Sequence, residues 1–224
     1  MSIDENGVIP EEYELNAVGE SLYTKKRSVL GLVLNIIIVL FVVILFFELL
    51  FNMFFTGIYV VNISMQPTFI GAESENVSGG DFIYINTSIK QPEYGDVVVV
   101  YRETKNHNGT VDKGNIIKRV VAFGGDTVRL DRGVLYVNDE IVDESYLYEG
   151  NNTPSLPINS FSTHTVKEGC MFLLGDNRNK STDSRENGDY PIDNLLGVVP
   201  KWSQDIKGFT TAIYTFFNFT IYGK

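Results

Sequence analysis

A serine at the end of an apolar segment is the first residue whose surroundings suit nucleophilic chemistry. Ser64 follows the extended segment Ile58–Val61 and precedes Pro67 by three residues. Because proline fixes φ and ends strand pairing, Ser64 lies at a rigid strand exit where its hydroxyl can be presented to another molecule. On this segment alone, an ordinary serine between a strand and a turn is the simpler interpretation.

Two adjacent bases, Lys118 and Arg119, interrupt a second apolar segment, Asn115–Asp126. Alternate residues of a strand share a face, so each base is expected among apolar neighbours: Lys118 with Ile116, Val120 and Ala122, and Arg119 with Ile117 and Val121. Burying an ammonium group is costly unless it is paired or loses its proton, and desolvation lowers a lysine pKa by up to about 3–5 units. Such a lysine is a general base at neutral pH, whereas a lysine that reaches the sheet rim keeps its charge.

A third segment, Gly175–Gly188, is a dense polar loop that follows the apolar strand Met171–Leu174. Ordinary turn chemistry would explain its composition. The loop also contains an acid and a base two residues apart, Asp183 and Arg185. Its several hydroxyl groups are suitable partners for a lysine that must be oriented.

The three segments resemble the sequence motifs of the type I signal peptidases, which are membrane-anchored Ser/Lys endopeptidases. The family patterns S-M-x-P-T, K-R-V and G-D-N-x-x-x-S-x-D-S-R are matched by Ser64–Thr68, Lys118–Val120 and Gly175–Arg185. A variant of the intermediate family motif, G-D-x-x-x-x-N, occurs at Gly80–Asn86. The motifs occur in the family's order, and the resemblance extends from the apolar N-terminal segment to Gly197.

The resemblance implies a role for each residue that matches a motif. Ser64 would be the nucleophile, Lys118 the general base that takes its proton, and Ser181 the hydroxyl that orients the lysine amine. Four further polar residues would hold and shape the loop, the last two as an ion pair: Asp176, Asn177, Asp183 and Arg185. Hydrolysis would proceed through an acyl-enzyme, with no cofactor and no metal.

The oxyanion hole is where the sequence departs from the family pattern. In the family it uses the amide of the nucleophile and often a hydroxyl two residues earlier, and here that position is Asn62. An asparagine amide can donate in its place, and one such donor contributes about 3–4 kcal/mol elsewhere. The sequence leaves open whether Asn62 completes the hole.

Substrate binding is expected to follow from strand geometry. An extended peptide can add as a strand beside Ile58–Val61, with its alternate side chains in shallow pockets. By resemblance, these pockets admit only small side chains at the first and third positions before the cut, which is the A-x-A preference of signal peptides. The residues expected to line them are Ile58, Val60, Met65 and Ile117.

An uninterrupted apolar run places the protein at a membrane. Residues 28–47 contain no charge, and a helix of this length spans roughly 30 Å, the thickness of a bilayer core. No A-x-A-like site follows the run, which favours a retained anchor over a cleavable signal peptide. The bases Lys25–Arg27 should stay in the cytoplasm, so we expect a single-pass protein of the plasma membrane with an acidic cytoplasmic tail, residues 1–27, and an extracytoplasmic domain.

The external part is predicted to be mainly β, an antiparallel β-sheet domain of the signal peptidase type that covers residues 56–208. Short β-branched and aromatic runs alternate there with Gly, Asn, Asp and Pro clusters. Residues 127–170 are expected to form an inserted hairpin and loop region, with a glycine turn at Asp131–Gly133. Residues 209–224 are apolar and aromatic but too short and polar for a second span, so we expect a final strand or a segment at the membrane interface.

Composition excludes several other classes of protein. The net charge of −10 argues against nucleic-acid binding, and the single cysteine, Cys170, excludes an intramolecular disulfide. The histidines His107 and His164 lack ligand spacing, which argues against a metal hydrolase, and the intact Lys118 makes a Ser–His pairing unnecessary. We therefore expect preprotein signal peptides and membrane lipid as partners. A catalytically silent assembly protein of this fold, used to build surface structures, is the alternative.

Overall fold

The computed structural model describes residues 29–72, 80–105, 111–148 and 160–222. The chain divides into two compact units, Met1–Leu49 and Leu50–Lys224. The predicted acidic tail and its basic end, residues 1–27, lie outside the described residues.

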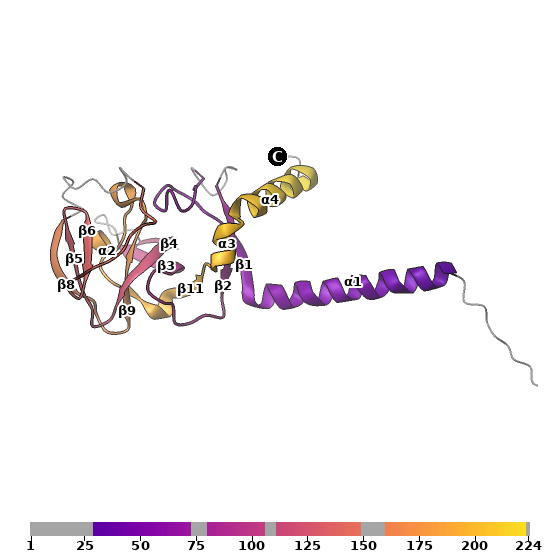
Figure 1. Ribbon diagram of the computed structural model, residues 1–224, viewed down its shortest axis with the longest axis horizontal. Coiled ribbons are helices and arrows are strands. Elements are labelled where there is room, and N and C mark those ends of the chain that lie inside the picture. Colours follow the sequence, from indigo (N-terminus) through magenta and orange to yellow (C-terminus); the bar gives the residue numbers. More distant parts are fainter. Residues whose placement is uncertain (1–28, 73–79, 106–110, 149–159, 223–224) are drawn as a thin grey trace, which may run out of the picture. The chain divides into compact units, whose positions relative to one another are not determined.

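The described part of the first unit is formed by one apolar helix, which continues a few residues into the second unit. Helix α1 runs from Val29 to Phe54, and none of its residues is buried (Figure 1). Its 26 residues correspond to about 39 Å, so it is long and apolar enough to cross a bilayer. The helix continues beyond the predicted end at residue 47 because Glu48 is a good helix former and apolar residues follow it without Gly or Pro.

A seven-stranded antiparallel sheet forms the body of the second unit, as the mainly β prediction required. Its strands lie in the order β1-β2-β11-β3-β4-β9-β10. The long central pair β3 and β4 is in register from Val97 opposite Arg119 to Lys105 opposite Val111. The strand bounds are β1 Phe55–Tyr59, β2 Phe82–Asn86, β3 Val97–Lys105, β4 Val111–Phe123, β9 Cys170–Leu174, β10 Tyr190–Pro191 and β11 Leu195–Val198.

The chain between β4 and β9 forms a second, four-stranded antiparallel sheet in the order β7-β6-β5-β8. The expected hairpin is present, because β5 pairs with β6 and the turn between them places Arg132 and Gly133 at positive φ. Figure 1 shows this small sheet beside β9 of the main sheet. Its strands are β5 Thr127–Asp131, β6 Val134–Val137, β7 Glu140–Ile141 and β8 Phe161–Thr165.

Three apolar clusters hold the second unit together. One lies under the Ser64 segment and includes Met65 and Phe69, and a second packs against the face of β4 that carries Val120. The third joins the two sheets and contains both Val121 and Ala122. The expectation that Ala122 shares the face of Lys118 is therefore wrong, because a β-bulge between Val120 and Ala122 shifts the alternation of the strand.

The C-terminal segment is a helix and not the expected strand. Helix α3 covers Lys201–Asp205, and helix α4 covers Lys207–Tyr222. The hydroxyls of Thr210 and Thr211 explain the change, because they bond the backbone of Phe82 in β2 and also the carbonyl of Lys207 one turn earlier. Contact with the sheet thus decides the conformation of a segment whose composition favours strands.

Candidate active site

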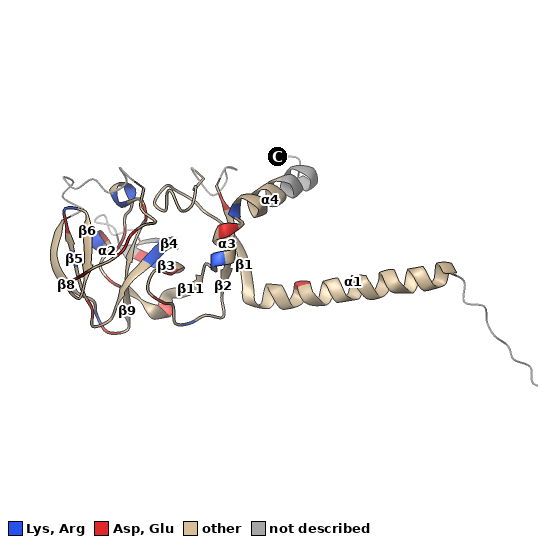
Figure 2. Cartoon of the chain, viewed as in Figure 1, with Lys and Arg blue, Asp and Glu red and all other residues tan. Residues whose placement is uncertain are grey.

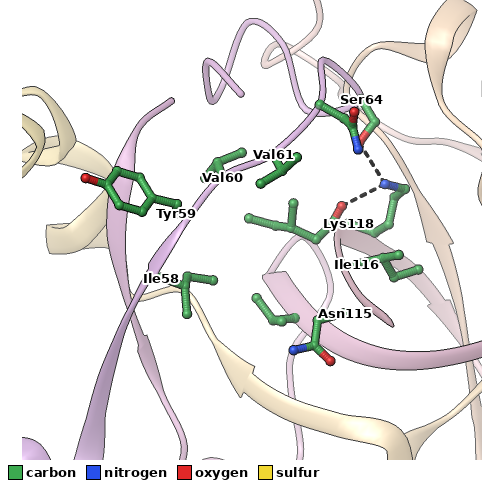
Figure 3. Close-up of a pocket in the computed structure, with 11 residues that line it drawn as sticks. Ile58, Tyr59, Val60, Val61, Ser64, Asn115, Ile116 and Lys118 are labelled. Atoms are coloured by element: carbon green, nitrogen blue, oxygen red, sulfur yellow. Dashed lines mark hydrogen bonds between the residues drawn. The ribbon is translucent and has the colours of Figure 1, made fainter. Parts of the chain in front are cut away.

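The side chains of Ser64 and Lys118 meet at the wall of a cavity. Lys118 Nζ donates to Ser64 Oγ at 2.8 Å and to the carbonyl of Ile117 at 2.8 Å (Figure 3). The lysine side chain is buried, with 4% of the residue exposed. A hydroxyl and an amine at this distance can exchange a proton directly, which is the geometry a serine nucleophile needs from its base.

Local packing explains why Ser64 is presented rigidly. The segment after β1 is closed by hydrogen bonds from the amide of Asn62 to Ala72 and from the amide of Phe69 to Met65. Asn62 adopts a positive φ of 68°, and a Cβ on Gly71 would lie 1.7 Å from the carbonyl oxygen of Asn62. Only glycine at position 71 allows the two backbones this approach. The buried side chains of Met65 and Phe69 anchor the turn that carries the nucleophile.

The polar loop Gly175–Gly188 is attached directly to the segment that carries Ser64. The amide of Asn177 donates to the carbonyl of Ser64 at 2.9 Å, and its side-chain amide donates to the carbonyl of Ile63 at 3.1 Å. Asn177 therefore holds the backbone on both sides of the Ile63–Ser64 peptide bond.

Burial sets the protonation of the lysine. The pKa of Lys118 is lowered from its ordinary value of 10.5 to about 8, chiefly by burial, and the cations Arg102 and Arg185 contribute in the same direction. The carboxylates of Asp183 and Asp176 act in the opposite direction. Near neutral pH a fraction of the enzyme therefore holds Lys118 as a free amine, the form that accepts a proton.

The predicted pair of Asp183 and Arg185 is present and buried. Arg185 Nε lies 2.8 Å from Asp183 Oδ1, and the side chains are 2% and 0% exposed. Asp183 Oδ2 also accepts from the amide of Gly175 at 3.0 Å, and Asp183 Oδ1 caps the short helix α2, Ser184–Asn187. The carboxylate of Asp183 thus binds the backbone at Gly175, where the polar loop begins, and at Arg185, in the helix that follows.

The second base of the strand has a partner that sequence reasoning missed. Arg119 binds Asp176 through two hydrogen bonds, of 2.9 Å from Nε and 2.6 Å from Nη2, and donates to the carbonyl of Gly95 at 2.7 Å. The hydroxyl of Thr68 also donates to Asp176. The two adjacent bases of β4, Lys118 and Arg119, are both buried. The apolar residues on the two strand faces around them were therefore the available sign that Arg119 has a buried partner of opposite charge.

Ser181 does not make the hydrogen bond expected of it. Its hydroxyl is buried and has no hydrogen-bond partner among the described residues, while the amine of Lys118 is directed to Ser64 and to the carbonyl of Ile117. Ser181 instead packs against Gly175, where an added Cβ would lie 2.2 Å from its hydroxyl oxygen. The tight approach of these two residues places the serine beside the loop backbone.

The cavity beside the dyad has a volume of about 420 Å³ and a largely aliphatic wall. Three of the four predicted pocket residues line it, but Met65 does not, because it is 0% exposed in the core beneath. Figure 3 shows side chains from β1 and from β4 facing one another across this space. The full lining is Ile58, Tyr59, Val60, Val61, Asn62, Ser64, Val99, Asn115, Ile116, Ile117 and Lys118.

Among the described residues, no group of three or more His, Cys, Asp or Glu side chains is arranged to hold a metal ion. His164 lies 2.7 Å from Asp189, on the small sheet, and His107 falls outside the described residues. The groups gathered around Ser64 are those of a serine hydrolase.

Comparison with known proteins places this geometry in a family. The sequence profile described as signal peptidase, peptidase S26, matches residues 33–202. Signal peptidase I P of Bacillus subtilis subsp. natto is 29% identical over 212 residues, which cover 90% of this chain and 95% of the relative. Signal peptidase I of Bacillus caldolyticus is 30% identical over 65% of this chain and 77% of its own.

A solved structure of a signal peptidase I from Enterococcus faecalis V583 is 28% identical, covers 50% of this chain and 100% of its own, and has a TM-score of 0.40. The profile match spans well over half of the chain and contains both Ser64 and Lys118. The chain therefore belongs to the signal peptidase family of serine endopeptidases, peptidase S26.

Proposed function

We propose that this protein removes signal peptides from exported preproteins by cutting after an A-x-A-like site, with Ser64 as nucleophile and Lys118 as general base. The observation that carries the proposal is the 2.8 Å contact between Ser64 Oγ, at the cavity wall, and the amine of the buried Lys118. Membership of the signal peptidase family supports the substrate class.

The reaction follows from the protonation state of the lysine. Neutral Lys118 takes the proton of the Ser64 hydroxyl while Oγ attacks the scissile carbonyl. The tetrahedral intermediate collapses to an acyl-enzyme, and the protonated lysine gives its proton to the leaving amine. That amine is the N-terminus of the mature protein, which leaves at this step, while the signal peptide stays bound to Ser64 as an ester. A water molecule, deprotonated by the same lysine, then attacks the ester, releases the signal peptide as a free carboxylate and restores the Ser64 hydroxyl.

The oxyanion is stabilised by the amide of Ser64 and by the side chain of Asn62. Support for Asn62 comes from its place on the cavity wall two residues before the nucleophile. Its positive φ is held by the close approach of Gly71, so its position does not depend on the substrate.

The peptide binds as an extended strand between the two cavity walls. β1 lies at the edge of the main sheet, so a backbone can pair with it, and the facing wall is the Asn115–Ile117 part of β4. The aliphatic side chains Ile58, Val60 and Ile117 line this space, and small apolar substrate side chains such as alanine suit such a wall.

The proposal includes a membrane anchor, helix α1, and the side of the membrane on which the catalytic unit lies. The apolar helix and the family are those of a membrane-anchored enzyme. The bases Lys25–Arg27 before the helix keep the N-terminus in the cytoplasm, which puts the catalytic unit on the outer face of the plasma membrane.

An apolar stripe along α3 and α4 rests on the lipid of that face. Trp202, Ile206, Phe209 and Ile213 follow helical spacing and are all exposed. Lys207 is the only charged residue of α4 (Figure 2), and Trp202 lies 5.5 Å from the ring of Phe55, where the anchor joins the sheet. Aromatic side chains at such a junction favour the bilayer interface.

The catalytically silent assembly protein is not favoured. Such a protein would have no need of a serine hydroxyl in contact with a buried lysine amine, and the relatives compared above are named as peptidases.

The test uses the full chain in detergent or proteoliposomes with a preprotein that carries an A-x-A site. We expect the wild type to cut, and Ser64→Ala and Lys118→Met each to lower the rate at least about a thousandfold without unfolding. Ser162→Ala and Lys167→Met are matched controls because both residues are exposed on or beside the small sheet. Full activity of either dyad variant would remove the assignment, and a folded but inert wild type would favour the assembly protein.

A further inference from the structure

A short turn outside every motif closes over the catalytic loop. The turn is Asp143–Tyr148, named the strap from here on, and it follows β7 of the small sheet. Two of its side chains reach residues of the active site: Glu144 contacts Arg178, and Tyr146 contacts Arg119. The strap therefore connects the inserted region to the loop that supports the dyad.

The first contact is an ion pair removed from water. Arg178 is 0% exposed, and both of its terminal nitrogens face the carboxylate of Glu144. Its Nε donates to the carbonyl of Gly175 at 3.1 Å. A buried guanidinium needs a counter-charge, so Glu144 fixes Arg178, and Arg178 fixes the start of the turn that carries Asp176 and Asn177.

The second contact covers the buried arginine of β4. The guanidinium of Arg119 lies 4.0 Å from the centre of the Tyr146 ring. The tyrosine hydroxyl donates to Glu144 at 2.8 Å, and burial together with the charge of Glu144 raises the pKa of Tyr146, so the phenol stays a donor. Glu144, Tyr146, Arg119 and Asp176 thus form one continuous chain of contacts.

This chain of contacts ends beside the general base. Arg119 is the next residue to Lys118, and the charge of Asp176, which Arg119 neutralises, acts directly on the lysine. The other charged groups that act on Lys118 are Asp183, Arg102 and Arg185. A change in the pairing of Arg119 with Asp176 therefore changes the electrostatic balance at the amine.

We infer that Glu144 and Tyr146 are positioning residues of this enzyme, which hold the Arg119–Asp176 pair and the Gly175 turn in the geometry that brings Lys118 to Ser64. The inference rests on the proposed function. The strap lines no part of the substrate cavity, so its loss acts on the chemical step and not on peptide binding.

The test measures kcat and KM on the A-x-A preprotein across pH, with full-length protein in proteoliposomes. For Tyr146→Ala we expect kcat to fall about tenfold to a hundredfold with KM within about twofold of wild type. Water then reaches Arg119, so the charge of Asp176 is less fully neutralised and raises the pKa of Lys118. The acid limb of the plot of kcat against pH therefore moves to higher pH. Tyr146→Phe keeps the ring over Arg119 and should retain most activity, and Tyr148→Ala, whose tyrosine is 64% exposed on the same strap, should change nothing.

A loss of folded protein would lower kcat equally at every pH, so the shift of the acid limb separates positioning from general destabilisation. Glu144→Gln, which keeps the shape of the side chain but removes the charge that pairs with Arg178, is the second variant, and we expect kcat to fall and the acid limb to move in it as well. An unshifted profile in both variants, or a wild-type kcat in Tyr146→Ala, would overturn the role of the strap. A wild type that cuts nothing beside an equally inert Ser64→Ala would instead overturn the proposed function, and the strap's role with it.

Discussion

Two different regions meet at Lys118, the aliphatic cavity and a charged cluster formed by Arg119, Asp176, Arg178, Asp183 and Arg185. The cavity is open to solvent, and its wall is built from side chains that need no partner. In the cluster, every charge is buried and each is matched by an opposite charge. A substitution in the cavity is therefore expected to change how well the substrate fits without unfolding the protein. The cluster tolerates few substitutions, because removing one charge leaves its partner buried and unpaired.

The largest effect is expected when the cluster is broken at Asp183. Asp183→Ala removes the partner of Arg185 and the acceptor of the Gly175 amide, so the free energy of unfolding should fall by about 3–5 kcal/mol. Chemical denaturation in detergent measures this change in the free energy of unfolding. Arg132→Ala, at an exposed pair with Asp131, should cost no more than about 1 kcal/mol. An equal loss of unfolding free energy in Asp183→Ala and Arg132→Ala would show that the buried pair contributes no more to stability than the exposed one.

The lysine itself should destabilise the folded protein when it is charged. Because the folded pKa of Lys118 is about 8 and its ordinary value is 10.5, the buried ammonium carries a penalty of roughly 3 kcal/mol below pH 8. The penalty fades as pH rises from 8 to 10.5 and is absent above. Lys118→Met should therefore gain stability over wild type at pH 7 and lose that gain at pH 10.5. A gain independent of pH, or one shared by the exposed Lys167→Met, would contradict this origin.

Activity should depend on the same protonation. Below pH 8 the neutral fraction of Lys118 falls about tenfold for each pH unit, leaving roughly a tenth of the enzyme active at pH 7. We expect kcat/KM to rise with pH and to level off above about 8. A rate that is flat from pH 5 to 8 would remove the lysine from the role of base.

A change in the cavity should act on binding alone. Val61 is half-buried on the cavity wall, and Val61→Phe fills space that a small substrate side chain occupies. We expect KM to rise about tenfold with kcat nearly unchanged. Val134→Phe, at an exposed position on the small sheet, is the control. A fall in kcat at constant KM would mean that the cavity and the cluster are not separable.

The smallest effect is expected far from the dyad, on the apolar stripe of α3 and α4. Trp202 is the only tryptophan of the chain, so its fluorescence in proteoliposomes reports this surface without labelling. Brominated lipids should quench it, and Phe209→Ser with Ile213→Ser should weaken the quenching while activity changes less than about threefold. Thr215→Ser, exposed on the same helix, should leave it unchanged. Quenching unaffected by the stripe variants would place α4 away from lipid.

Sequence patterns anticipated the parts of the molecule that depend on neighbouring residues. The apolar run before Phe54, the alternation of the β runs and the glycine turn at Gly133 are local signals, and each appears in the structure. The motifs also placed Ser64 and Lys118 in one site, although 54 residues separate them. Resemblance to a family supplied that link, because no local pattern reports which distant segments meet.

Contacts between distant segments decided the rest. The composition of residues 209–222 favours a strand, yet the hydroxyls of Thr210 and Thr211 bond β2 more than 120 residues away and make it a helix. Met65 has the character of a pocket residue but lies in the core, because the turn that presents Ser64 needs an anchor.

The sequence by itself therefore determined the apolar helix, the fold class and, through resemblance to a family, that Ser64 and Lys118 share one site. Only the tertiary structure decided how the dyad is supported, through Asp176 on Arg119 and Glu144 on Arg178, which lie 57 and 34 residues apart along the chain. The physical reason is that a buried charge requires a partner of opposite sign but not a particular spacing in sequence. The choice of partner is made by the packing of the loop against the sheet.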